Sequence, residues 1–368
     1  MTTGLVYHDD YLKHKQVEHH PECPERLKLT MEHFLRTNFL DMLTQITPEK
    51  ASVEDITRVH TPEHIQYVKC MSEKGAGMFP IDSDTYICQD TYEVARLAAG
   101  GVIKAGEAVF KGEVDNCFAL VRPPGHHASL NQATGFCYFD NAAIMVKHLQ
   151  ANYGVKKVFI FDWDAHAPNG TMGTFYKDPS VLNISIHQDP HSFYPGTGFI
   201  EQIGEGAGKG CTINFPVPAG TGDADYVFFI ERFVIPRVRK FKPEMIVVAA
   251  GQDSHISDKI SQLNVTDAGF ARMTELLMAL AKEVCGGKLV LELEGGYNLL
   301  TLPQTHYIIV STLLGMKHQL PIEGDVLPTT RDLLNRLEDT LKAATIWHEA
   351  PDVEAREDKD KGCGILPP

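Results

Sequence analysis

Short runs of apolar residues alternate along this 368-residue chain with longer segments of helical periodicity. Near-continuous apolar strands that alternate with helices predict a parallel sheet buried on both faces, because the crossover helices cover it. The fold class that we expect is α/β, with a single central parallel sheet flanked by helices on both faces. We expect strands at 4–7, 117–121, 158–161, 182–186, 245–250 and 289–293, and helices near 26–39, 94–110, 142–152, 225–240, 268–284, 303–316 and 330–346.

The sequence shows no internal repeat and no low-complexity linker, so residues 1–348 read as one domain. Residues 349–368 differ, because the stretch 352–361 is mostly charged and lacks apolar periodicity; this predicts a poorly ordered tail. Glycine-rich stretches at 75–84 and 196–222 predict long loops, which are often functional in compact α/β proteins.

The formal net charge is −14, from 34 basic and 48 acidic residues. This balance argues against non-specific binding to nucleic acid or to an anionic membrane. A cationic substrate is compatible with it, although a solvated surface explains it equally well. No run of about 20 apolar residues predicts a membrane span, and the amino terminus lacks the apolar run of a signal peptide. The eight cysteines form no C-x-x-C pair, which excludes zinc-ribbon and thioredoxin motifs and predicts a reduced, cytoplasmic protein.

Polar residues cluster where five of the expected strands end. Ligands of open α/β sheets bind outside the carboxyl ends of the strands, so these clusters predict one common site. They are RPPGHH at 122–127, DWDAH at 162–166, His187, GQDSH at 251–255 and EGGY at 294–297.

Asp164 and His166 are two residues apart and share one face of an extended segment. Alone, this pair would also fit a solvated turn, but Asp253 at a second strand end favours a metal site. Two carboxylates and one imidazole suit Zn²⁺ with an open coordination position. Fe²⁺ is possible too, because the ligand types do not separate these metals.

His126 and His127 follow a Pro-Pro-Gly turn that brings them to the same sheet edge. An isolated histidine pair more often lies on the surface without a function. At this sheet edge, an imidazole could remove a proton from water and return one to a leaving amine. Asp162 and Asn169 are candidates to hold the two rings. Tyr297 follows two glycines and could donate a hydrogen bond to a developing oxyanion, although this triplet alone would favour a core tyrosine.

These motifs together resemble the histone deacetylase superfamily, and more closely its class II-like prokaryotic branch with the acetylpolyamine amidohydrolases. The resemblance spans roughly residues 20–315 and implies the arginase–deacetylase fold. It is carried by HPECPER, RPPGHHA, GFCYFDNAAI, FDWDAH with NGT two residues later, SIHQDPHSFYPGTG, AGQDSH and LEGGYN.

The resemblance also implies a role for each matching residue. The zinc ligands would be Asp164, His166 and Asp253. His127 would be the general base and acid, His126 its electrostatic partner, and Tyr297 the hydrogen-bond donor to the transition state. Asp162 and Asn169 would hold His126 and His127, respectively. Gly135, Phe136 and Tyr194 would line the acyl tunnel, Arg26 an internal channel, and Asp84 or Asp82 the substrate-gripping rim; a structural K⁺ would be held by Asp162, Asp164, His166, Ser185 and Ile186.

The chain departs from the family pattern at two places. Ala167 and Pro168 replace the second histidine and the glycine of the family's Asp-x-Asp-x-His-His-Gly-Asn-Gly run. Because proline fixes φ and removes a donor, we expect the placement of Asn169 to be affected, with lowered activity or an altered acyl preference. Gln252 and Ser254 flank Asp253 where Phe and Ala are common, so the packing around that ligand should differ.

The function expected is that of a zinc-dependent amidohydrolase that removes an acyl group, most simply acetyl, from the side chain of acyl-lysine in a peptide or protein. An acetylpolyamine deacetylase is the alternative; such enzymes narrow the tunnel by dimerisation or a long loop, so a homo-oligomer is possible. Longer acyl groups are a further option. A catalytically silent binding module is the alternative from another class. An arginase-like binuclear manganese site needs more ligands than these strand ends offer.

Overall fold

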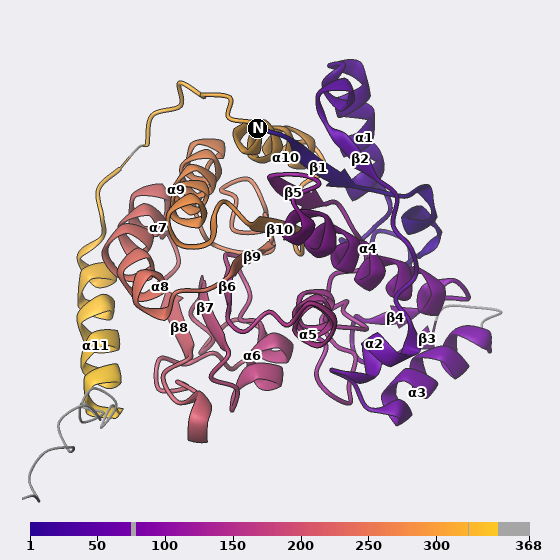
Figure 1. The fold of residues 1–368 in the computed structure, drawn as a ribbon, viewed down its shortest axis with the longest axis horizontal. Helices are drawn as coiled ribbons and strands as arrows, with labels where there is room; N and C mark the ends of the chain where they lie inside the picture. Colours follow the sequence, from indigo (N-terminus) through magenta and orange to yellow (C-terminus); the bar gives the residue numbers. More distant parts are fainter. Residues whose placement is uncertain (75–78, 323, 345–368) are drawn as a thin grey trace, which may run out of the picture.

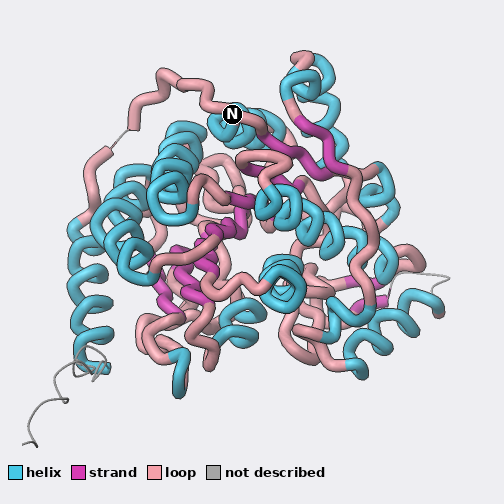
Figure 2. The backbone as a smooth tube through the Cα atoms, viewed as in Figure 1, coloured by secondary structure: helices cyan, strands magenta, loops and turns pink. Residues whose placement is uncertain are grey.

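A single eight-stranded sheet forms the centre of the molecule (Figures 1 and 2). The computed structural model describes residues 1–74, 79–322 and 324–344. All strand pairings in this sheet are parallel, in the order β2-β1-β5-β10-β9-β6-β7-β8. The expected parallel α/β architecture is thus confirmed. The strands are β1 Thr3–Val6, β2 Thr44–Ile46, β5 Asn116–Ala119, β6 Val158–Asp162, β7 Val181–Gln188, β8 Thr212–Val217, β9 Met245–Ala250 and β10 Leu289–Leu293.

Helices cover both faces of this sheet (Figure 1). Gly101 of α4 packs against Val6 and Val121, whereas His306 of α10 packs its ring on Phe118, which points to the opposite face. The helices are α1 Glu25–Arg36, α2 Val53–Thr57, α3 Pro62–Glu73, α4 Thr91–Lys111, α5 Asn141–Tyr153, α6 Asn169–Phe175, α7 Asp223–Phe229, α8 Ile235–Phe241, α9 Asp267–Cys285, α10 Leu302–Leu313 and α11 Pro328–Ala344. No helix in the described part of the chain is both long and apolar enough to cross a bilayer.

One row of side chains across the sheet leads directly to the site. Strand register aligns Ala119 with Glu292, Glu292 with Ala249, Ala249 with Asp162, and Asp162 with Ser185. Registered residues of parallel strands point to the same face, so this row lies on the face that α4 covers. Three polar side chains of this row, those of Glu292, Asp162 and Ser185, are therefore buried between the sheet and the helices, close to the carboxyl ends of the strands.

Several parts of the expected fold were wrong or incomplete. The stretch 196–222, expected as a loop, contains edge strand β8; β2 at the other edge was also not expected. β8 includes Pro216, and proline is tolerated at sheet edges but weakens the sequence signal for a strand. The helix expected at 225–240 is α7 and α8 joined by a π-helical turn, Ile230–Val234. Within the loop expected at 75–84, β3 Phe79–Pro80 pairs with β4 Tyr86–Ile87; residues 75–78, 345–346 and the tail 349–368 lie outside the described residues.

Candidate active site

The carboxyl ends of adjacent strands β6 and β9 bring three possible metal ligands together. Asp164 and His166 follow β6, and Asp253 follows β9. One donor atom from each lies within 4.8 Å of the other two. His166 Nδ1 is 3.1 Å from Asp164 Oδ1 and 2.9 Å from Asp253 Oδ2. The structure thus gathers the three predicted ligands around a single point.

Backbone amides orient both carboxylates toward that point. Gly295 N–H donates to Asp164 Oδ2 at 2.8 Å, and Ala165 N–H donates to Asp253 Oδ1 at 2.8 Å. Gly295 is also needed for space, because a Cβ there would lie 2.5 Å from a carboxylate oxygen of both aspartates. A larger residue at 295 would therefore push the two carboxylates away from their present positions.

The charges of this cluster fit a cation. Burial raises the pKa of Asp253 to about 7, and the charge of Asp164 adds to this shift. Burial would lower the pKa of His166, but hydrogen bonds to both aspartates outweigh it and raise the pKa to about 9. Two buried carboxylates that share one imidazole nitrogen thus hold a proton strongly, and a divalent cation competes for the same position. The donor set of two carboxylates and one imidazole fits Zn²⁺ with an open coordination position.

His126 and His127 lie beside the triad, each held by its predicted partner. Asp162 Oδ2 is 3.0 Å from His126 Nδ1, and Asn169 Oδ1 is 2.6 Å from His127 Nδ1. The expected disturbance by Pro168 is not seen in this contact. Asn169 is the first residue of α6, whose amides at Gly170 and Thr171 donate to the carbonyl oxygen of His126 at 3.0 and 3.2 Å. The helix start therefore fixes Asn169 behind the histidine pair.

The two histidines are shifted in opposite directions. Burial lowers the pKa of His127 well below its usual value, and the charges of His126 and His166 lower it further. Burial opposes the charge on His126 as well, but Asp164, Glu294 and Asp162 outweigh it and raise the pKa well above its usual value. His127 is therefore neutral near neutral pH, whereas His126 is an imidazolium.

The hydrogen bond to Asn169 also selects the tautomer of His127. An amide oxygen only accepts hydrogen bonds, so Nδ1 of His127 carries the ring proton. Nε2 is then an unprotonated nitrogen with a free lone pair. This is the state that a general base needs.

Two buried glutamates behind the pair were not among the residues expected from the sequence. Glu294 Oε2 accepts from the amides of Gly125 at 2.8 Å and His126 at 3.2 Å. Both carboxyl oxygens of Glu292, and Oε1 of Glu294, lack a hydrogen-bond partner among the described residues. Burial and the neighbouring Glu294 raise the pKa of Glu292 well above its usual value. Glu292 could have been found from the sequence, because it is a charged residue inside the otherwise apolar strand LVLEL.

Tyr297 is half-buried and held by the turn that precedes it. Arg26 Nε donates to the carbonyl oxygen of Gly296 at 2.6 Å, and its guanidinium lies 4.9 Å from the centre of the Tyr297 ring. Burial raises the pKa of the phenol well above its usual value, while the charge of Arg26 opposes this shift. Tyr297 thus keeps its proton and remains a hydrogen-bond donor.

The residues expected to line the acyl tunnel surround this cluster. Gly135 and Phe136 have left-handed φ values of 56° and 68°, and a Cβ on Gly135 would lie 2.4 Å from the ring of His127. The ring centre of Tyr194 is 5.0 Å from that of His127. Phe193, which the sequence analysis did not single out, stacks on His166 at 4.5 Å; its signal was its position beside Tyr194.

The rim aspartates and the expected K⁺ residues occupy different surroundings. The carboxylate of Asp82 is hydrogen-bonded within the protein, since its Oδ2 accepts from Thr134 Oγ1 at 2.9 Å. Asp84, in contrast, is exposed. Ser185 is buried on β7, in register with Asp162, and Ile186 follows it on the same strand.

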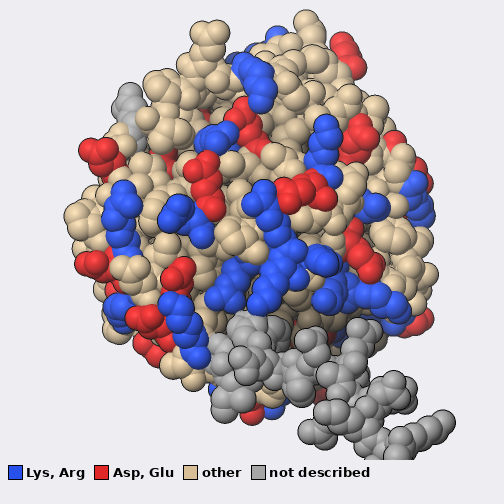
Figure 3. All heavy atoms as spheres, turned by 60° about the vertical axis from the view of Figure 1, so that its left-hand side comes forward, with Lys and Arg blue, Asp and Glu red and all other residues tan. Residues whose placement is uncertain are grey.

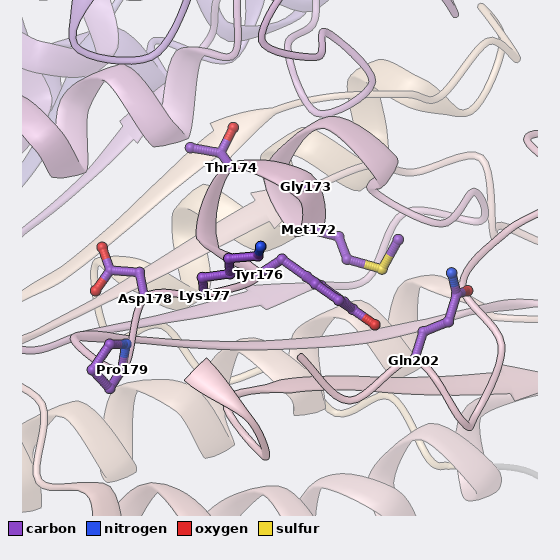
Figure 4. A pocket seen from close by; sticks show the side chains of 8 residues that line it. All are labelled: Met172, Gly173, Thr174, Tyr176, Lys177, Asp178, Pro179 and Gln202. Atoms are coloured by element: carbon purple, nitrogen blue, oxygen red, sulfur yellow. The ribbon is translucent and has the colours of Figure 1, made fainter. Parts of the chain in front are cut away.

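A surface cavity of about 700 Å³ lies beside α6 and contains none of these residues (Figure 4). The side chain of Tyr176 extends over it toward Gln202. No residue of the triad or of the histidine pair lines this cavity, so we do not assign it to the candidate active site.

The sheet order, helix arrangement and polar strand ends define an enzyme-like α/β domain of the arginase–deacetylase class. A crystal structure described as the HDA15 HD domain has a TM-score of 0.86 and 35% sequence identity, covering 94% of this chain and 97% of that one. A family model described as the histone deacetylase domain matches residues 20–313. The chain therefore belongs to the histone deacetylase family, whose members hydrolyse amides.

Curated relatives agree with this assignment. A probable deacetylase of Archaeoglobus fulgidus is 44% identical over 86% of this chain and 87% of its own length. A histone deacetylase-like amidohydrolase of Pseudomonas aeruginosa is 37% identical over 81% of this chain and 78% of its own. Histone deacetylase 15 of Arabidopsis thaliana is also 37% identical, over 91% of this chain but only 62% of its own length.

Proposed function

We propose that this chain is a zinc-dependent deacylase that hydrolyses the side-chain amide of acyl-lysine, with acetyl as the acyl group. The observation that carries this proposal is geometric: the histidine pair, held by Asp162 and Asn169, lies beside the three gathered side chains of the triad. A base and a positive charge lie next to each other, at a site whose donor atoms suit Zn²⁺. Fe²⁺ fits the same donors.

The triad residues would hold the ion, which supplies Lewis acidity toward the amide carbonyl when bound. His127 accepts a proton from the attacking water at Nε2, because Asn169 holds the proton of Nδ1. The same nitrogen then returns the proton to the departing amine. His126 stays cationic and stabilises the negative charge that develops beside it. Tyr297 donates its phenolic hydrogen to the carbonyl oxygen as that oxygen becomes anionic.

The walls favour a narrow, extended group over a bulky one. Phe136 and Tyr194 contribute aromatic surfaces near Tyr297 and His127, at ring-centre distances of 6.0 and 5.0 Å. An acyl-lysine side chain is apolar and unbranched along its length, so these surfaces match it. The exposed carboxylate of Asp84 is the rim group that we assign to the peptide backbone of the substrate.

We also assign a structural K⁺ to the oxygens of Asp162, Asp164, His166, Ser185 and Ile186. Its support is positional: Asp162 and Ser185 are in register on neighbouring strands, and Asp162 Oδ1 accepts from the backbone N–H of the triad residue Asp164 at 2.9 Å. A monovalent cation there would offset part of the negative charge that these buried carboxylates share.

Polyamine deacetylation is the rival within the same chemistry. The net charge of −14 is weak support for it, because the charge is unevenly distributed: Figure 3 shows a band of lysine and arginine side chains across one face. Acetyl-lysine peptides compared with acetylputrescine, acetylcadaverine and acetylspermidine would decide between the substrates. Higher kcat/KM on any of the acetylated polyamines would contradict the lysine assignment.

Replacing Tyr297 by Phe tests the catalytic assignment. Loss of one oxyanion donor typically lowers kcat by about 10²–10³-fold, and we expect this loss without a change in zinc affinity, since the phenol is not a ligand. Acetate release and zinc content of the purified variant give the two values. Near-normal turnover would contradict the role of Tyr297. Zinc binding by the wild type without hydrolysis of any acylated substrate would favour a silent binding module.

A further inference from the structure

Gln252, one of the two departures beside Asp253, has a buried side chain whose amide nitrogen and oxygen are both hydrogen-bonded. It is 2% exposed. Its Nε2 donates to the carbonyl oxygen of Ala250 at 2.5 Å, and its Oε1 is 3.0 Å from Nε2 of His306. The residue directly before a triad ligand is thus tied both to the end of β9 and to α10.

His306 extends this connection to a third element. It is completely buried on α10, and its Nδ1 lies 2.8 Å from Oγ1 of Thr30 on α1. Burial, with a smaller contribution from the charge of Arg26, lowers the pKa of His306 to about 3. The ring is therefore neutral, and since the amide oxygen of Gln252 only accepts, Nε2 carries the ring's one proton.

Gln252 also touches the turn that carries Tyr297. Its backbone N–H donates to the carbonyl oxygen of Gly295 at 3.0 Å. A Cβ on Gly296 would lie 2.9 Å from Cβ of Gln252, so the two chain segments are in close contact. Gly296 has a φ of 113°, which only glycine adopts readily. Gln252 thus connects the segment that carries Asp253 to the turn that carries Tyr297.

We propose that Gln252 and His306 form a positioning pair that fixes Asp253 and Tyr297 relative to each other. The inference rests on the proposed function, because Asp253 matters as a zinc ligand and Tyr297 as an oxyanion donor. Neither member of the pair touches the substrate. Gln252 makes the direct contacts with the two segments, and His306 anchors the side chain of Gln252 to α10.

The test compares Gln252→Met and His306→Phe, which keep the volume and shape of each side chain but remove the hydrogen bond. Loss of a supporting partner behind a metal site typically costs about 10–100-fold in metal affinity or activity. We expect Gln252→Met to weaken zinc binding by about tenfold and to lower kcat with little change in KM. His306→Phe should act in the same direction, and the double variant should be no worse than the more severe single one.

Thr312→Val on the same helix is the matched control. It removes a buried hydroxyl that donates to Ile308 but leaves the pair intact, so zinc affinity and kcat should stay at wild-type values. Zinc affinity, measured by competition with a chelating dye, does not depend on turnover. His306→Phe keeps the test valid if Gln252→Met fails to fold.

The outcomes separate this inference from the proposed function. Wild-type zinc affinity and kcat in both folded single variants, or fully additive effects in the double variant, would overturn the positioning pair alone. A wild-type protein that binds no zinc would overturn the proposed function and the pair's role with it. Equal losses in Thr312→Val would show that general destabilisation of α10 causes the effect, and would also overturn the inference.

Discussion

Buried charge at single residues shapes this site. Four carboxylates are buried near His126, whose pKa they help to raise, and Asp164 also contacts His166; they are Asp162, Asp164, Glu292 and Glu294. Burying an unpaired carboxylate is strongly unfavourable, so some of these groups must hold a proton. Glu292 is the clearest candidate, because burial and the neighbouring Glu294 raise its pKa well above the usual value and neither of its oxygens has a hydrogen-bond partner among the described residues.

The pH dependence of stability should reveal this proton. A carboxyl group whose folded pKa is raised destabilises the fold as pH rises, because the unfolded group ionises first. Above the usual pKa of a glutamate, the buried Glu292 should cost about 1.4 kcal/mol of folding stability per pH unit until its folded pKa is reached. We expect Glu292→Gln, which is neutral at every pH, to be increasingly more stable than wild type from pH 5 to pH 8.

Thermal unfolding at several pH values measures this difference, with Glu32→Gln on the exposed side of α1 as control. A gap between Glu292→Gln and wild type that does not widen with pH would show that Glu292 ionises in the fold.

Gly295 gives a steric test at the residue scale. Its missing Cβ leaves room for both triad carboxylates, so Gly295→Ala should weaken zinc binding by at least tenfold. Gly173→Ala is the control: apart from its chain neighbours and the backbone of its own helix, no described atom lies within 4 Å of its Cβ position, and alanine in a helix should stabilise it by about 0.5–1 kcal/mol. Zinc titration of both variants decides; equal affinities would mean that the carboxylates can relax without loss.

At the scale of elements, α6 shows why part of the site could not be predicted. Its sequence NGTMGTF contains two glycines and no amphipathic pattern, so local propensity gives no helix. The helix forms at a tertiary contact, where its first amides meet the carbonyl oxygen of His126. The family resemblance predicted from the sequence that Asn169 lies behind His127. Whether Pro168 disturbs this placement could be seen only in the folded structure, where Asn169 still contacts His127.

Asn169 at the start of α6 gives the prediction for this element. Asn169→Ala should lower kcat by about 10–100-fold, because His127 loses the acceptor that selects its tautomer, while zinc affinity should not change. Asn169→Asp places a carboxylate at Nδ1 and should raise the pKa of His127, which moves the acid limb of the pH–rate profile to higher pH. An unshifted acid limb in Asn169→Asp would argue that another group is the base.

At the scale of the whole molecule, the sequence was most informative about the regular alternation of strands and helices. Buried strands and helices alternate, so the parallel sheet and the gathering of Asp164, His166 and Asp253 at one edge were predictable. The edge strands β2 and β8 carry weak signals because they are short or contain Pro216. Contacts such as Gln252 to His306 join residues 54 apart in sequence and follow no local pattern.

The central claim is that one divalent ion, held by the triad, is needed for amide hydrolysis. Titrating metal-stripped protein with Zn²⁺, while measuring bound zinc and acetate release from an acetyl-lysine peptide, tests this most directly. The account predicts that acetate release rises with bound zinc up to one ion per chain, and that Asp253→Ala loses both. Acetate release that is unaffected by stripping the metal, or wild-type zinc binding by Asp253→Ala, would contradict it.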